Sequence, residues 1–144
     1  MEATETFRIQ HDELFVIIKD IAGNLKADAL RTDAKSVRLQ LSKMAGVLGA
    51  HLSIEDRWLY PKLVAHADAS VARLAKRYQD EMSGLKEEFD AYMTRWETSK
   101  KIQANPETFI KETLGFFEML SQRMHRENSE LYTLLDRLGL ESLA

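Results

Sequence analysis

The sequence has no cysteine, and only two prolines and six glycines occur among its 144 residues. Without cysteine the chain forms no disulfide, catalytic thiolate, zinc finger or iron–sulfur cluster. A metal site would have to be built from His, Asp and Glu, whose donors are imidazole nitrogen and carboxylate oxygen. Histidine is also scarce, because the sequence has only His11, His51, His66 and His125.

A long apolar run and a strong excess of one charge are also missing. No stretch approaches the roughly 18 to 20 apolar residues of a membrane-spanning helix. The first residues, MEATE, are acidic and polar where a signal peptide would be basic and then apolar, so we expect a cytoplasmic protein without membrane association. The net charge of −3 and the lack of a basic stripe with interleaved aromatic residues argue against nucleic acid as a partner.

Apolar residues recur at steps of three and four, and alternation with a period of two is nowhere sustained, so the sequence predicts an all-α protein. We expect one domain over residues 1–144, with helices at about residues 4–25, 33–65, 70–100 and 106–138. Asn105 and Pro106 fit the cap and first position of the last helix, and Pro61 should kink or restart the second. Four long helices with short connections predict an up-down-up-down four-helix bundle.

The second predicted helix carries two polar residues on its apolar face. That face comprises Val37, Leu41, Met44, Leu48, His51 and Glu55. A buried carboxylate is expensive unless an opposite charge or a metal ion neutralises it. His51 and Glu55 are one helical turn apart, so both side chains could reach one cation or bridge two.

The other predicted helices offer further candidates at a comparable depth. His11 lies near the middle of the apolar face of the first predicted helix. Glu81 is the ionisable residue closest to the apolar face of the third predicted helix. In the fourth helix Glu127 lies about 60° from the centre of the face and His125 about 100°, with Glu130 further still. Taken singly, a histidine on an apolar face is more often a core residue, and the glutamates are better explained as solvated carboxylates. Their convergence at one level of a bundle is what favours a shared metal site.

Residues 51–61, HLSIEDRWLYP, closely resemble the H-x-x-x-E-[ED]-x-x-L-[YF]-P signature of the hemerythrin-like, HHE cation-binding domains. His11 also matches the first histidine of that family, and the resemblance covers all four predicted helices. It implies a four-helix bundle around two non-haem iron atoms. By this resemblance His11, His51 and Glu55 are metal ligands, and Glu55 bridges the two metals.

The sequence departs from the family pattern in its third and fourth helices. The third helix of the family normally offers a His after a Glu or similar residue, but here Glu81 is followed by Met82. The fourth normally reads H-x-x-x-E-x-x-x-L-Y, and aligning the Leu-Tyr pair places Arg123 at the His and Glu127 at the Glu. The alternative alignment uses His125 and Glu130 but misplaces the Leu-Tyr pair, so the first agrees better with the helix-face count.

An oxygen carrier of this family uses five histidines, more than this chain has. We therefore expect a carboxylate-rich centre, with iron as the metal and manganese or zinc also tolerated. It would react with dioxygen, peroxide or nitric oxide, or sense iron or redox state, rather than transport oxygen reversibly. Turnover would make it an oxidase or peroxidase. The alternative is a metal-free helical interaction module that has lost part of the ligand set, and a homodimer is compatible with either.

Overall fold

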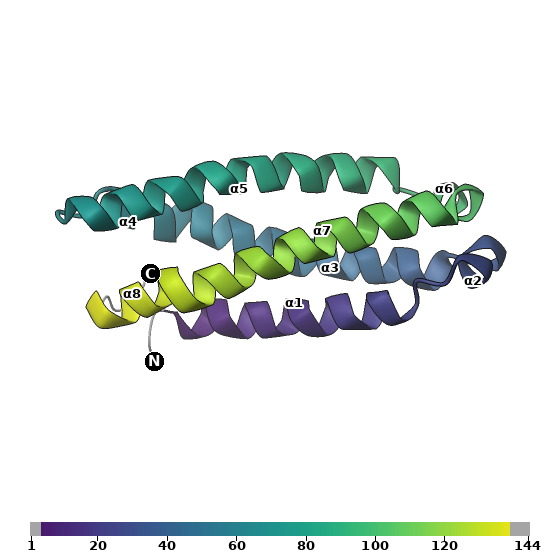
Figure 1. The fold of residues 1–144 in the computed structure, drawn as a ribbon, viewed down its shortest axis with the longest axis horizontal. Helices are drawn as coiled ribbons and strands as arrows, with labels where there is room; N and C mark the ends of the chain where they lie inside the picture. The colour runs from purple at the N-terminus through teal and green to yellow at the C-terminus, as the bar shows by residue number, and fades with distance from the viewer. Residues whose placement is uncertain (1–3, 139–144) are drawn as a thin grey trace.

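Four long helical rods pack against one another and form the body of the molecule (Figure 1). The computed structural model describes residues 4–138, and no β-strand occurs among them. The second and fourth rods each contain a short π-helical turn, labelled η, between two α-helices. The elements are α1 (Glu5–Gly23), α2 (Ala27–Thr32), α3 (Lys35–Ile54), η1 (Glu55–Leu59), α4 (Tyr60–Val64), α5 (Ala69–Arg95), α6 (Ser99–Ala104), α7 (Pro106–Arg126), η2 (Glu127–Leu131) and α8 (Tyr132–Leu138). The predicted all-α four-helix bundle is confirmed.

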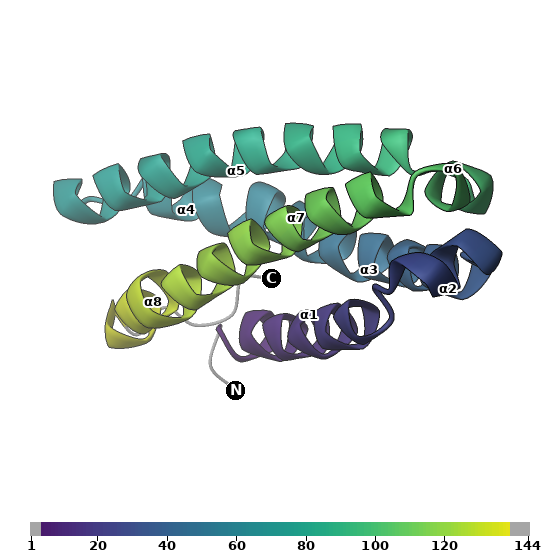
Figure 2. The same cartoon turned by 45° about the vertical axis from the view of Figure 1, so that its right-hand side comes forward.

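Two short helices close one end of the bundle. Both views show α2 and α6 next to each other beyond the ends of the long rods (Figures 1 and 2), and the two helices are in contact. Their buried residues Leu30 and Ile102 extend the core there. The third helix was predicted to reach residue 100, but α5 ends at Arg95. The hydroxyl of Thr98 accepts a hydrogen bond from the backbone N–H of Lys101 and starts α6 instead.

The beginnings of α5 and α7 illustrate two kinds of helix start. The carboxylate of Asp68 accepts a 2.8 Å hydrogen bond from the backbone N–H of Ser70 at the start of α5. Pro106 is the first residue of α7 and Asn105 precedes it, as predicted. However, the Asn105 side chain makes no capping hydrogen bond, so the start of α7 relies on the fixed backbone angle of Pro106.

The interior of the bundle divides into an apolar part and a polar part. Near α2 and α6, aromatic rings from α5 and α7 stack on one another, with Tyr92 and Phe116 only 5.4 Å apart between ring centroids. Towards the other end the buried residues include His11, His51 and Glu127. None of the described helices combines the length and the apolar character needed to span a membrane.

Candidate metal centre

Four buried ionisable side chains from three of the rods converge in the polar part of the interior. They are His11 from α1, His51 from α3, Glu55 from η1 and Glu127 from η2. Each is at most 2% exposed, and one ligand atom from each lies within 4.8 Å of all the others. We call these residues the His/Glu cluster. Its donors, two imidazole nitrogens and two carboxylates, are those that transition metals accept in proteins.

The two imidazole rings face each other through their Nε2 atoms, which are 3.0 Å apart. On the outer side of each ring, Nδ1 lies against an amide oxygen: Oδ1 of Asn128 at 2.8 Å for His11, and Oε1 of Gln10 at 2.7 Å for His51. An amide oxygen only accepts hydrogen bonds, so each Nδ1 carries a proton, and each imidazole in its neutral form presents a lone pair on Nε2. Two neutral rings would therefore face each other with lone pairs, and a proton or a metal ion between them relieves the repulsion.

The carboxylates of Glu55 and Glu127 lie next to these Nε2 atoms. Oε1 of Glu55 lies 2.5 Å from Nε2 of His51, and Oε1 of Glu127 lies 3.2 Å from Nε2 of His11. Despite the short distance to His51, Oε1 of Glu55 lacks a hydrogen bond of acceptable geometry from any described residue. Buried carboxylate oxygens are almost always satisfied. A metal ion would satisfy this oxygen and both nitrogens at once, so the cluster fits a metal.

Burial and mutual contact shift the proton affinities of the cluster strongly. Burial and the neighbouring Glu127 raise the pKa of Glu55 to about 8, although His51 opposes this. Burial lowers the pKa of His51, but the carboxylates of Glu55 and Glu127 outweigh it and raise the pKa to about 9. Burial also raises the pKa of Glu127, but hydrogen bonding to its cluster neighbours and the charge of Arg123 prevail and hold the pKa well below its usual value. Without a metal, protons would have to neutralise the cluster.

Both glutamates of the cluster are the first residue of a π-helical turn. The backbone N–H of Tyr60 donates to the carbonyl of Glu55, five residues earlier, and the N–H of Tyr132 donates to the carbonyl of Glu127. In a regular α-helix two residues five apart point about 140° away from each other. The wider turn reduces this difference, so each glutamate and the tyrosine five residues later are buried on the same side.

Each of these two tyrosines contacts the glutamate that begins the other π turn. The hydroxyl of Tyr60 donates to Oε2 of Glu127 at 2.8 Å, and the hydroxyl of Tyr132 makes a longer contact of 3.5 Å with Oε2 of Glu55. Neither tyrosine was predicted from the sequence as a site residue. The available signal was the repeated E-x-x-x-L-Y pattern, which occurs at Glu55 and again at Glu127.

Arg123 is a further residue of the site. It lies one turn before Glu127, as His51 lies one turn before Glu55, and it is only 8% exposed. Its Nη2 donates to the hydroxyl of Tyr60 at 2.8 Å and to the backbone carbonyl of Tyr78 at 2.9 Å. Its Nε lies 3.6 Å from Oε2 of Glu127. The guanidinium therefore holds the side of Glu127 that faces away from the histidines.

The remaining candidate ligands lie outside the cluster. Glu81 is 44% exposed in its side chain and pairs with Arg126 at 2.9 Å and with Arg123 at 3.3 Å. The ring of exposed His125 packs against Phe15, and the carboxylate of Glu130 accepts a hydrogen bond from Tyr78. The fourth rod thus brings Glu127 to the cluster, in agreement with the alignment on its Leu-Tyr pair, and α5 brings none of its carboxylates.

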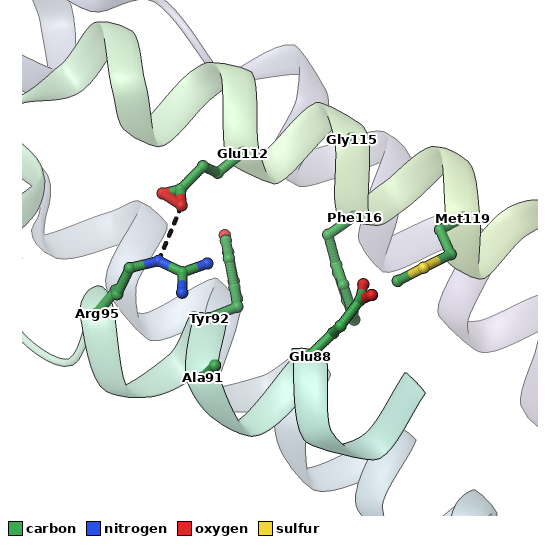
Figure 3. Close-up of a pocket in the computed structure, with 8 residues that line it drawn as sticks. All are labelled: Glu88, Ala91, Tyr92, Arg95, Glu112, Gly115, Phe116 and Met119. Atoms are coloured by element: carbon green, nitrogen blue, oxygen red, sulfur yellow. Dashed lines mark ion pairs between the residues drawn. The ribbon is translucent and has the colours of Figure 1, made fainter. Parts of the chain in front are cut away.

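A surface hollow of about 260 Å³ lies elsewhere, between α5 and α7 (Figure 3). Tyr92 and Phe116 form its floor, and Arg95 pairs with Glu112 at its edge with an Nε to Oε1 distance of 2.8 Å. No member of the His/Glu cluster lines this hollow. It is therefore a feature of the aromatic part of the bundle and not an opening to the candidate metal centre.

The fold and the buried cluster together define a helical-bundle protein with an interior site able to bind a metal ion. The family model described as the hemerythrin HHE cation-binding domain matches residues 2–135 of the chain. The chain belongs to the hemerythrin HHE family. No curated protein and no solved structure matches it significantly.

Proposed function

We propose that the chain binds iron through Nε2 of His11 and His51 and through the carboxylates of Glu55 and Glu127. The observation that carries this proposal is the meeting of two Nε2 atoms with a carboxylate oxygen that lacks a hydrogen bond, in a buried interior. Protein side chains avoid such an arrangement unless a cation stabilises it. Membership of a cation-binding family supports the same reading. Manganese or zinc would suit these nitrogen and oxygen donors as well.

The side chains around the cluster would hold its ligands in place. Gln10 and Asn128 fix the tautomer and the orientation of the two imidazoles, because each accepts the Nδ1 proton. Phe7 packs edge-on against His51 with ring centroids 5.8 Å apart, and this apolar contact keeps water from the ring. Bound iron would supply one-electron chemistry towards a small molecule such as dioxygen, peroxide or nitric oxide.

We further propose that this chemistry is irreversible oxidation or the sensing of iron or redox state, and not oxygen transport. The cluster offers two histidines and two carboxylates, whereas the oxygen carriers that the sequence resembles use five histidines. Anaerobic loading with ferrous iron followed by exposure to air tests this directly. We expect an absorption spectrum that remains after oxygen is removed. A spectrum that returns completely to that of the ferrous protein would contradict the proposal.

The metal itself is tested by elemental analysis of protein purified without chelator from cells grown with added iron. We expect bound iron in the parent and in a His66→Ala control, since His66 lies outside the cluster. We expect none in Glu55→Ala. Iron-free parent protein that also fails to bind added ferrous, manganous or zinc ions would favour a metal-free interaction module.

A further inference from the structure

We infer that this chain holds a single metal ion, and that the guanidinium of Arg123 supplies the positive charge on the side of the cluster where a second ion would lie. This inference rests on the proposed function, because it concerns the same site. It replaces the sequence-based expectation of two iron atoms with one metal ion and the positively charged side chain of Arg123.

The sequence contains two similar segments that build the two halves. One reads His51-x-x-x-Glu55-x-x-x-Leu-Tyr, and the other reads Arg123-x-x-x-Glu127-x-x-x-Leu-Tyr. Both glutamates begin a π turn, and both tyrosines reach the carboxylate of the opposite half. The halves differ at the residue one turn before the glutamate. An imidazole is a metal ligand, whereas a guanidinium is always protonated and has no lone pair to donate.

The carboxylate of Glu127 divides its two oxygens between a histidine side and the side of Arg123. The Oε1 atoms of Glu55 and Glu127 lie next to the imidazoles of His51 and His11. The Oε2 atom of Glu127 is taken by the hydroxyl of Tyr60 and lies 3.6 Å from Nε of Arg123. Two imidazole nitrogens, Oε1 of Glu127 and the carboxylate of Glu55 remain, and Oε2 of Glu55 has only the 3.5 Å contact with Tyr132. These four side chains form the donor set of one ion.

The rod formed by α5 supplies no replacement ligand on the opposite side. Among the described residues, the acidic and imidazole groups within metal-binding distance of one another come from the other three rods. The buried residues of α5 at this level are Tyr78 and Met82. The Tyr78 hydroxyl donates to Glu130 and its backbone carbonyl binds Arg123. A second ion would have to compete with the guanidinium for Glu127 without a histidine to hold it.

Charge also balances with one divalent ion. Such an ion would neutralise the two carboxylates of the cluster, while Arg123 is neutralised by Glu81 at 3.3 Å. Glu81 is itself held by Arg126. Arg123, which stands where the family pattern has a histidine, is thus the partner of Glu81, the candidate ligand of the third helix. A second divalent ion beside Arg123 would leave excess positive charge in a low-dielectric interior.

The experiment measures metal stoichiometry in the intact protein by zinc titration and by elemental analysis after ferrous loading. One equivalent per chain is expected. Ferric protein with one ion should also give the EPR signal of an isolated high-spin centre, whereas a spin-coupled ferric pair would be EPR-silent. Two tightly bound equivalents overturn this inference and leave the proposed function intact. No bound metal overturns the proposed function and this inference with it.

Variants at Arg123 test whether its guanidinium is what limits the chain to one metal ion. Arg123→His places an imidazole one turn before Glu127, and we expect the stoichiometry to rise from one to two. Arg126→His, on the exposed side of the same helix, is the matched control and should stay at one. A folded Arg123→His protein that binds only one equivalent overturns the assignment.

Arg123→Met keeps the test decisive if the histidine variant does not fold. Glu127 keeps the Tyr60 hydroxyl as a donor in this variant. Removing a positive charge near the cluster should therefore tighten zinc binding at the first site, on the order of tenfold. Unchanged or weaker binding in folded Arg123→Met protein would overturn the role of the guanidinium as a competing cation. Circular dichroism of each variant shows whether the helices are intact.

Discussion

The hydroxyl of Tyr60 donates a 2.8 Å hydrogen bond to Oε2 of Glu127, a residue of a different helical rod. Tyr60 is completely buried, and burial together with the charges of Glu55 and Glu127 raises its pKa far above that of an ordinary tyrosine. The phenol therefore remains a proton donor at every physiological pH. It also accepts a hydrogen bond from Arg123, so it transmits the position of the guanidinium to the carboxylate.

Replacing Tyr60 by Phe should weaken metal binding because Oε2 of Glu127 loses its donor. Loss of a residue that orients a metal ligand typically costs about 10- to 100-fold in affinity, and we expect a zinc dissociation constant raised by that factor. Stability of the metal-free protein should fall by about 1–2 kcal/mol, since a buried hydrogen bond is lost. Competition titration with a chromophoric chelator measures the first effect and urea unfolding the second.

The matched control is Tyr92→Phe. The hydroxyl of Tyr92 shares a 2.6 Å hydrogen bond with Thr113 in the aromatic part of the bundle, away from the cluster. This variant should lose stability to a similar degree and keep the zinc affinity of the parent. Equal affinities in Tyr60→Phe and Tyr92→Phe would show that Tyr60 acts only as a core residue.

Gln10→Leu should lower metal affinity without removing a ligand. Gln10 accepts the Nδ1 proton of His51 at 2.7 Å and so keeps Nε2 free to bind the metal. Without this acceptor the ring can adopt the other tautomer, and zinc should bind about 10-fold more weakly. Gln122→Leu, at an exposed position of α7, serves as the control. An unchanged affinity in Gln10→Leu would mean that the tautomer of His51 is set by other contacts.

Much of the bundle follows from the spacing of apolar residues, because four amphipathic helices can bury their faces only against one another. The same spacing placed His11, His51 and Glu55 on inward faces, and the structure brings these residues together. Glu127 was expected about 60° from the centre of its face under regular α-helical geometry. Glu127 instead follows buried Leu120 and Arg123 at regular steps of three and four. The π turn that starts there brings Tyr132 to the same side as Glu127, and regular periodicity contains no sign of such a turn.

The direction of the Glu81 side chain cannot be predicted from the residues of its own helix alone. Glu81 lies beside buried Met82, so a count of residues along α5 places it near the apolar face. Its actual direction is decided by Arg123 and Arg126 of α7, which attract its carboxylate to the surface between the two helices. The two arginines lie more than forty positions further along the chain. Only the packing of α5 against α7 reveals this pairing.

Glu55→Gln should raise the stability of the metal-free protein and at the same time weaken metal binding. The carboxylate of Glu55 is fully buried and its Oε1 lacks a hydrogen bond from the described residues, so the metal-free parent bears the cost of burying it. The amide has nearly the same shape and no charge. We expect metal-free Glu55→Gln to be more stable than the metal-free parent by about 1–3 kcal/mol in urea unfolding.

Zinc should then reverse this order. A ligand that binds only the folded state, at 1,000 times its dissociation constant, adds about 4.1 kcal/mol to the free energy of unfolding. The parent should gain this amount and Glu55→Gln should gain almost nothing, because the variant has lost a ligand. A metal-free variant that is much less stable than the parent would show that Glu55 stabilises the bundle through contacts other than a metal.

Glu127→Gln and Glu81→Gln provide the most direct comparison of the two glutamates that sequence analysis proposed for the third and fourth helices. Glu127 lies inside the cluster with Oε1 3.2 Å from Nε2 of His11, so its amide variant should bind zinc at least 100-fold more weakly, on the order of the loss expected for a direct ligand. Glu81 makes only partly exposed ion pairs with Arg123 and Arg126, each expected to contribute about 0–1 kcal/mol. Glu81→Gln should therefore keep one equivalent of zinc, with an affinity lowered by less than about tenfold because Arg123 loses a partly exposed counter-charge. If it instead loses the metal while Glu127→Gln retains it, then the bound state differs from the arrangement described here and α5 contributes a ligand.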